Sequence, residues 1–139
     1  MLLTIKKILP LSIAVYGTII ILSCIVIFHL LVMAGIIPFN IVWGGNLTDK
    51  TELYTMEAIS VALNVLMLLT ILIYSRAVKL NINRKIITGT IWFMFGLFLF
   101  NTIGNLAAKN ALETYIFTPL TLVLSVFCFR MAAFDPQEK

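Results

Sequence analysis

Residues 8–34 read ILPLSIAVYGTIIILSCIVIFHLLVMA, a run of about 27 residues with no Lys, Arg, Asp or Glu and with one histidine, His29. Crossing the hydrocarbon core of a bilayer, about 30 Å thick, takes about 20 helical residues. The run is much longer than the apolar part of a secretory signal, which has roughly 7–15 residues. We therefore interpret it as a retained membrane-spanning helix, and its extra length predicts tilting or projection beyond the bilayer.

The composition of the whole chain favours a membrane setting. Of the 139 residues, 61% are hydrophobic and only 12% are charged, and the mean hydropathy is +1.07. A soluble domain is about half apolar and a quarter charged. This chain therefore has too few charges to solvate a globular surface, and its length corresponds to a single transmembrane domain over residues 1–139.

Three further apolar segments are long enough to span a bilayer, at about residues 54–75, 86–104 and 112–131. Such segments must be helices, because lipid offers no other partner for backbone N–H and C=O groups. The predicted fold is therefore an all-α integral membrane four-helix bundle. Pro119 lies inside the fourth segment, where its missing amide donor is expected to kink the helix.

The basic residues indicate the orientation. Lys50 and Lys109 lie on one side of the predicted helices, and the other eight lie on the opposite side: Lys6, Lys7, Arg76, Lys79, Arg84, Lys85, Arg130 and Lys139. The positive-inside rule places both termini and the middle loop in the cytoplasm. Despite the net charge of +4, these cations flank apolar runs and form no phosphate-binding face, so no nucleic-acid partner is expected. We expect a multi-pass protein of the bacterial cytoplasmic membrane.

The longest loop, at about residues 35–53, then lies on the outside. It contains IPFNIVWGGN at residues 37–46, whose apolar side chains are unsuited to water. We expect this segment to fold back over the helix ends as a structured lid. Trp43 would be its anchor, and Gly44–Gly45 would be its hinge, because glycine permits positive φ.

Deep polar side chains gather near this loop. Three residues share one face of the second predicted helix, two are one turn apart on the third, and one comes late in the first. Because odd helices run outward and even helices run inward, all six lie in the outer half of the membrane: His29, Glu57, Ser60, Asn64, Asn101 and Asn105. Polar groups at this depth are costly and are default candidates for a functional site.

The cluster allows two interpretations. The first is an outward-facing ligand pocket, which Trp43 and Thr118 would extend, and in which His29 and Glu57 could exchange a proton. The second is a structural network of interhelical hydrogen bonds, each worth about 0.6 kcal/mol in membranes. Glu57 also has a simpler explanation, because it follows the predicted helix start at about residue 54, where the helix dipole favours a carboxylate.

Two patterns of small residues predict helix packing. A narrow face of the fourth helix carries Thr114, Thr118, Thr121, Ser125 and Cys128, and the third helix carries Gly89, Gly96 and Gly104. Small residues let helices approach closely in lipid, so we interpret both faces as packing surfaces.

Few residues of the sequence could form a disulfide or bind a metal. Cys24 and Cys128 fall at different predicted depths, so no disulfide is expected between them. With one histidine and no CxxC pair, the sequence predicts no metal site and no cofactor.

The segments PFNIVWGGN, ELYTMEAIS, NTIGNL and ETYIFTPLTL follow one another along the chain. In these segments the chain resembles a group of small four-helix bacterial membrane proteins without an assigned activity. The resemblance implies the four-helix fold and no particular chemistry.

Three functions follow in decreasing order of preference. The first is a binding or accessory protein with an outer-leaflet pocket for a membrane lipid or another lipophilic small molecule. The second is a structural subunit or homo-oligomer that uses the glycine or threonine face. The third is an acid–base enzyme acting on a lipophilic substrate, with His29 and Glu57 as the candidate pair. No residue is assigned a catalytic role, and a non-enzymatic function is preferred.

Overall fold

The structure of the protein, a computed structural model, describes residues 9–38, 42–43, 49–108 and 111–134. Its main helices are α2 (Leu11–Met33), α3 (Lys50–Tyr74), α4 (Arg84–Leu106) and α5 (Thr118–Ala133). A π-helical turn, η3 (Glu113–Phe117), precedes α5. No strand occurs among these residues, so the all-helical expectation is confirmed for them.

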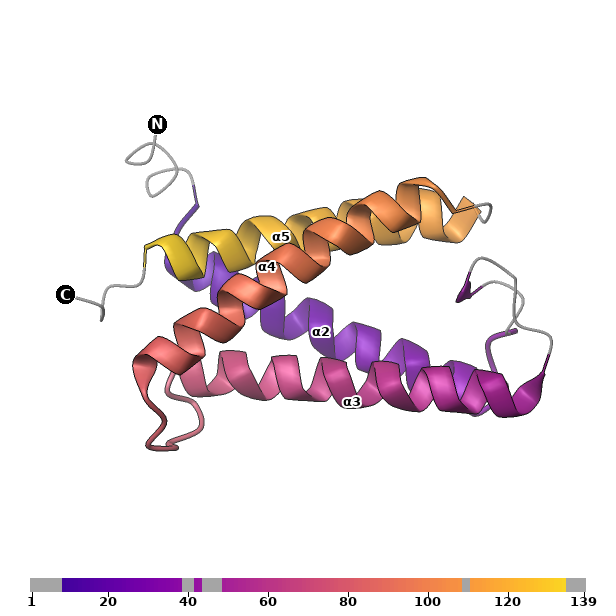
Figure 1. Cartoon of the computed structure of the whole chain (residues 1–139), viewed down its shortest axis with the longest axis horizontal. Coiled ribbons are helices and arrows are strands. Elements are labelled where there is room, and N and C mark those ends of the chain that lie inside the picture. Colours follow the sequence, from indigo (N-terminus) through magenta and orange to yellow (C-terminus); the bar gives the residue numbers. More distant parts are fainter. Residues whose placement is uncertain (1–8, 39–41, 44–48, 109–110, 135–139) are drawn as a thin grey trace.

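The helices form two pairs (Figure 1). α2 packs along α3, α4 packs along α5, and α2 also contacts α5. α3 and α4 lie close together at the end of the bundle that carries their connection, residues 75–83, and diverge toward the opposite end. We call the first end the turn end. The second, which carries the connection between α2 and α3, is the loop end.

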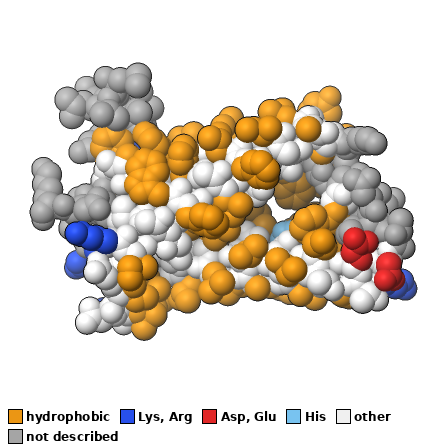
Figure 2. All heavy atoms as spheres, in the orientation of Figure 1, with side chains coloured by type: hydrophobic (Ala, Val, Ile, Leu, Met, Phe, Trp, Pro, Cys, Tyr) orange, Lys and Arg blue, Asp and Glu red, His pale blue; other side chains and the backbone are white. Residues whose placement is uncertain are grey.

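The surface of the bundle is apolar. Four helices are long and apolar enough to cross a membrane, the fourth of them counted from Thr114. Large hydrophobic side chains cover the face shown in Figure 2, and Phe93 and Phe100 are 67% and 72% exposed. Water disfavours a contiguous apolar surface of this extent, whereas lipid does not. The architecture is compatible with a multi-pass membrane protein.

Two helix starts differ from the predicted positions. α2 begins at Leu11 and not at residue 8, because Pro10 has an extended conformation with φ −57° and ψ 143°. α3 begins at Lys50, ahead of the predicted start at about residue 54. The predicted span was drawn from the run of apolar residues, so it left out Lys50 and Glu52. Charged residues can nevertheless continue a helix beyond the hydrocarbon core.

Pro119 lies where the helix changes type. The helix is divided before it: Glu113–Phe117 are π-helical, and α5 starts at Thr118 with the proline in its first turn. A proline costs little in that position, because the N–H groups of a first turn have no partner within the helix. The backbone therefore accommodates Pro119 by a change of helix type.

The main core lies toward the turn end, where all four helices contribute. Six of its large side chains are completely buried: Leu22, Ile71, Ile91, Met94, Leu124 and Met131. The Tyr74 hydroxyl donates to the carbonyl of Met131, 3.3 Å away, and links α3 to α5. This half of the bundle is closed.

The threonine face of α5 is a packing seam, as predicted. Thr118, Thr121, Ser125 and Cys128 are all buried. The hydroxyls of Thr121 and Thr102 lie 2.9 Å apart, and the Ser125 hydroxyl donates to the carbonyl of Phe95 at 3.4 Å. These bonds hold α5 against α4. Cys128 is buried, Cys24 is exposed and both are free, so the expectation of no disulfide is confirmed.

The predicted packing of the glycine stripe is wrong within this chain. A Cβ atom placed on Gly89, Gly96 or Gly104 would have no neighbour within 4 Å, and all three positions are exposed. The close approach occurs elsewhere, at Gly17 on α2, where a Cβ would collide with the Phe127 ring of α5.

Candidate functional site

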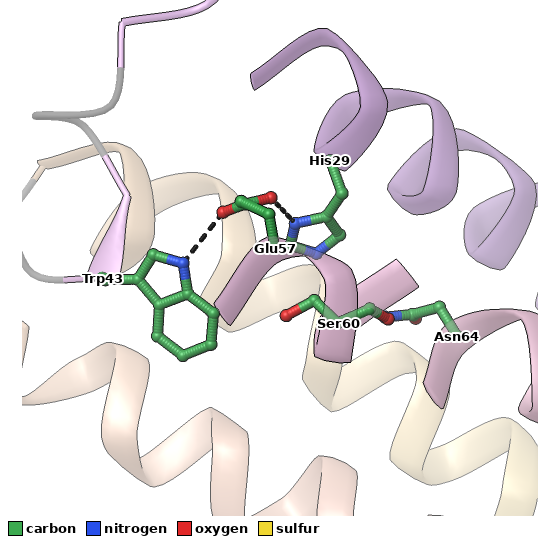
Figure 3. Close-up of polar contacts among 5 residues, drawn as sticks. All are labelled: His29, Trp43, Glu57, Ser60 and Asn64. Atoms are coloured by element: carbon green, nitrogen blue, oxygen red, sulfur yellow. Dashed lines mark hydrogen bonds and ion pairs between the residues drawn. The ribbon is translucent and has the colours of Figure 1, made fainter. Parts of the chain in front are cut away.

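Glu57 is the centre of a polar cluster at the loop end (Figure 3). Its side chain is completely buried. One carboxyl oxygen, Oε2, lies 2.6 Å from His29 Nδ1 on α2, and the other, Oε1, accepts a hydrogen bond of 2.8 Å from Trp43 Nε1. Both oxygens are therefore occupied. One side chain ties α2, α3 and the segment between them together.

The explanation of Glu57 by the helix dipole is wrong. α3 begins at Lys50, so Glu57 lies about two turns inside the helix. The dipole effect falls off within the first turn. The carboxyl group is held instead by partners from outside its own helix.

Trp43 holds the connecting segment against the helices. Its φ of 55° lies in the left-handed region, which is unusual for a bulky residue and costs about 1–3 kcal/mol. The bond to Glu57 helps offset this cost, as does Val42, which is buried against Val32 and Leu53. Val42 and Trp43 thus fold back onto the helices. The predicted hinge at Gly44–Gly45 lies outside the described residues.

A groove of about 590 Å³ opens beside this cluster, where α3 and α4 diverge. Its walls are formed by α3 and α4, and its floor by residues of α2, η3 and α5. On the floor, Phe28 meets Phe117 edge to face, with ring centroids 5.2 Å apart. Figure 2 shows a hollow on this face of the bundle with the single histidine inside it. The volume falls within the roughly 300–1,000 Å³ of small-molecule sites.

The lining of the groove changes along its length. The part toward the loop end carries His29, Trp43 and Ser60, whereas the deeper part carries four apolar side chains: Ile25, Met67, Leu97 and Phe98. Between them lie Asn64 on α3 and Asn101 on α4. The polar groups of the groove thus gather toward the loop end, where they share the lining with Phe28, Val42 and Phe117, and the deeper end is apolar.

The amide side chains of the groove have unused hydrogen-bonding capacity. Asn64 Nδ2 donates to the carbonyl of Ser60 on its own helix at 2.8 Å, which leaves its Oδ1 available. Asn105 Nδ2 lies 3.5 Å from the Thr121 hydroxyl. Among the described residues, no hydrogen bond is found for the exposed Asn101 side chain or the Ser60 hydroxyl. A purely structural network would use these groups more completely.

Six of the eight predicted pocket residues line the groove: His29, Trp43, Ser60, Asn64, Asn101 and Asn105. Glu57 lies behind this surface, and the buried Thr118 is not part of it. Thr121, one turn further along α5, reaches the lining in its place. The aromatic pair Phe28 and Phe117 was missed, because apolar residues in a membrane helix give no sign of whether they face lipid or a cavity.

The reactive potential of the site rests on His29. Its ring is partly exposed toward the groove while Nδ1 faces Glu57, so a ligand could reach only the rest of the imidazole. Glu57 itself is shielded from the groove. Within the described ranges, no group of three His, Cys, Asp or Glu side chains could hold a metal ion.

Comparison with known proteins does not assign the chain to a family. No protein-family model matches the chain, and neither does any curated protein or solved structure. The resemblance to small four-helix bacterial membrane proteins therefore gains no support from these comparisons, and functional inference rests on the groove itself.

Proposed function

We propose that the protein binds a lipid-like amphiphile in the groove between α3 and α4, in a binding or accessory role. The graded lining is the observation that carries this proposal. It would hold an acyl chain against Met67 and Leu97 and a polar head near His29 and Ser60. The groove opens sideways between two helices, so a lipid could enter it directly from the membrane.

The charge distribution supports an outer-leaflet location. The turn end carries the cationic Arg76, Lys79 and Lys85, and the loop end carries the acidic Asp49 and Glu52. By the positive-inside rule the turn end would face the cytoplasm. The groove would then take its ligand from the outer leaflet of a bacterial cytoplasmic membrane.

Filling the groove tests the proposal. Gly104 lines it, is exposed and has space around it, so Gly104→Phe would narrow the groove without a clash at Cβ. A lipid with a photoreactive acyl chain should label the peptides containing Met67 and Leu97. We expect Gly104→Phe to reduce this labelling about tenfold, the equivalent of about 1.4 kcal/mol.

Gly89→Phe is the matched control. Gly89 is an equally open glycine on α4, far from the groove, so the labelling should not change. Equal labelling of the wild type and the Gly104→Phe variant would overturn the proposal.

A structural or oligomeric subunit is the second candidate, and the outward-facing glycines favour it. Gly89 and Gly96 lie exposed on α4 with open space around them, which would suit a helix of another copy. Detergent-resistant oligomers that are lost on Gly96→Leu would support this role. A monomer at all concentrations would exclude a homo-oligomer.

An acid–base enzyme ranks third. The contact of 2.6 Å between His29 and Glu57 suits a dyad in which the carboxyl group orients the imidazole. However, Glu57 is shielded and has both oxygens occupied, so only His29 could reach a substrate.

A further inference from the structure

We propose that the groove selects an uncharged, hydroxyl-bearing head group and discriminates against an anionic one. This inference rests on the proposed function and goes further by naming the chemistry of the ligand. It follows from the charges and hydrogen-bonding groups at the polar end of the groove.

The described lining of the groove offers no lysine or arginine to an anion. In the described lining and directly behind it, the charged or ionisable pair is His29 and Glu57, which share the contact of 2.6 Å. With a neutral imidazole and a carboxylate the pair has a charge of −1, and with one more proton it is neutral. An anionic head group would therefore lose its hydration without gaining a counter-ion, at a cost of several kcal/mol.

A cationic head group is matched poorly as well. Among the described side chains, the acid beside the groove is Glu57, which is completely buried and has its two oxygens paired with His29 and Trp43. No carboxylate oxygen is left to meet an ammonium group. The lining therefore favours ligands without a formal charge.

Hydroxyl groups match what remains. The Ser60 hydroxyl and the Asn101 amide can each donate and accept, and Asn64 presents an available carbonyl oxygen. A hydroxyl is also both donor and acceptor, so a head group with two or more hydroxyls can satisfy several of these groups at once. A group that only accepts, such as a phosphate or a sulfate, leaves Asn64 Oδ1 without a donor.

The opposite end of the bundle provides an internal contrast. A hollow of about 520 Å³ at the turn end is lined by Arg76, Lys79 and Arg84. Cations at a membrane surface attract anionic lipid heads. Among the described residues, cationic side chains thus line the hollow at the turn end and are absent from the lining of the groove.

The test compares three amphiphiles with the same oleyl-type chain: monoolein, with a glycerol head; oleyl sulfate, a permanent anion; and oleyltrimethylammonium, a permanent cation. Each competes with the photoreactive lipid for labelling of the groove peptides. The protein is held in phosphatidylcholine nanodiscs, because a maltoside detergent would itself present hydroxyl groups. Only labelling that Gly104→Phe removes and Gly89→Phe retains is counted, which excludes binding at the turn end.

We expect monoolein to compete at concentrations at least about tenfold lower than either ion, an advantage that one unmatched polar group can produce. Asn64→Leu should remove most of this advantage. Thr70→Val should not, because it removes a similar bond to the carbonyl four residues earlier on α3, away from the groove.

Two failures are distinguishable. Equal or tighter competition by either charged amphiphile would overturn the head-group inference and leave the proposed function intact. Absence of labelling sensitive to Gly104→Phe would overturn both.

Discussion

The two ends of the bundle use their side chains in opposite ways. Toward the turn end, four helices converge on side chains such as Ile71, Ile91 and Leu124, which are completely buried. Toward the loop end, α4 follows α5 away from α3, and the space between them is lined by apolar side chains together with polar groups such as Ser60 and Asn101. The closed half holds the buried core, and the open half contains the groove that we propose as a ligand site.

The comparison also explains the position of Glu57. Where α3 and α4 no longer touch, the loop end loses part of the packing that closes the other half. The hydrogen bonds of Glu57 to His29 and Trp43 supply a link between α2, α3 and the connecting segment in its place. The cluster is therefore a structural network beside the groove, as the second interpretation of the sequence expected, and the ligand pocket stays a proposal.

The largest loss of stability is expected when the hydrogen bonds of Glu57, which link α2, α3 and the connecting segment at the loop end, are broken. Glu57→Ala leaves the Trp43 indole N–H and His29 Nδ1 without their partner. We expect a loss of about 3 kcal/mol in the free energy of unfolding in micelles, at the lower end of the range for a broken buried pair. Glu52→Ala, at an exposed acid in the first turn of the same helix, is the control. A loss for Glu57→Ala below about 1 kcal/mol, typical of surface pairs, would contradict the assigned role.

A somewhat smaller effect is expected in the closed half. Ile91→Ala removes a completely buried side chain where all helices converge. The cost should be about 2 kcal/mol, because the cavity term remains while lipid removes much of the hydrophobic term. Ile103→Ala, at a position 61% exposed on the same helix, should change the unfolding free energy very little. Equal losses for the two variants would show that the halves do not differ in packing.

The smallest expected effect is on amide hydrogen exchange in and beside the segment that connects α2 and α3. Trp43→Phe keeps an aromatic ring but removes the N–H bonded to Glu57. One hydrogen bond is worth about 1 kcal/mol, so amide hydrogen exchange at Val42 and Leu53 should accelerate about fivefold. Trp92→Phe, in the closed half, is the matched control, since its edge contacts with Phe95 and Phe129 require only a ring. Unchanged exchange in the Trp43 variant would mean that apolar packing alone holds the segment.

Much of the architecture could be predicted from residue types. The four spans follow from apolar length, and the convergence of His29, Glu57 and Asn101 follows from counting turns along alternating helices. The helix starts were less predictable. A run of apolar residues indicates which part of a helix lies in lipid, but α3 already starts at Lys50, before that run begins. The glycine stripe was misjudged for a related reason: small side chains permit a close contact but do not say with which helix it forms.

The sequence by itself determined that this chain is a bundle of apolar helices with its deep polar groups at one end, because both properties depend on residue type and on the fixed rise of a helix. The tertiary structure decided which of those groups meet and where space remains. Glu57 pairs with His29 and Trp43. The bonds of Thr121 and Ser125 hold α4 against α5, while α4 diverges from α3. The groove exists because α4 packs closely on α5 but diverges from α3. The sequence of one helix does not specify which neighbouring helix it packs against.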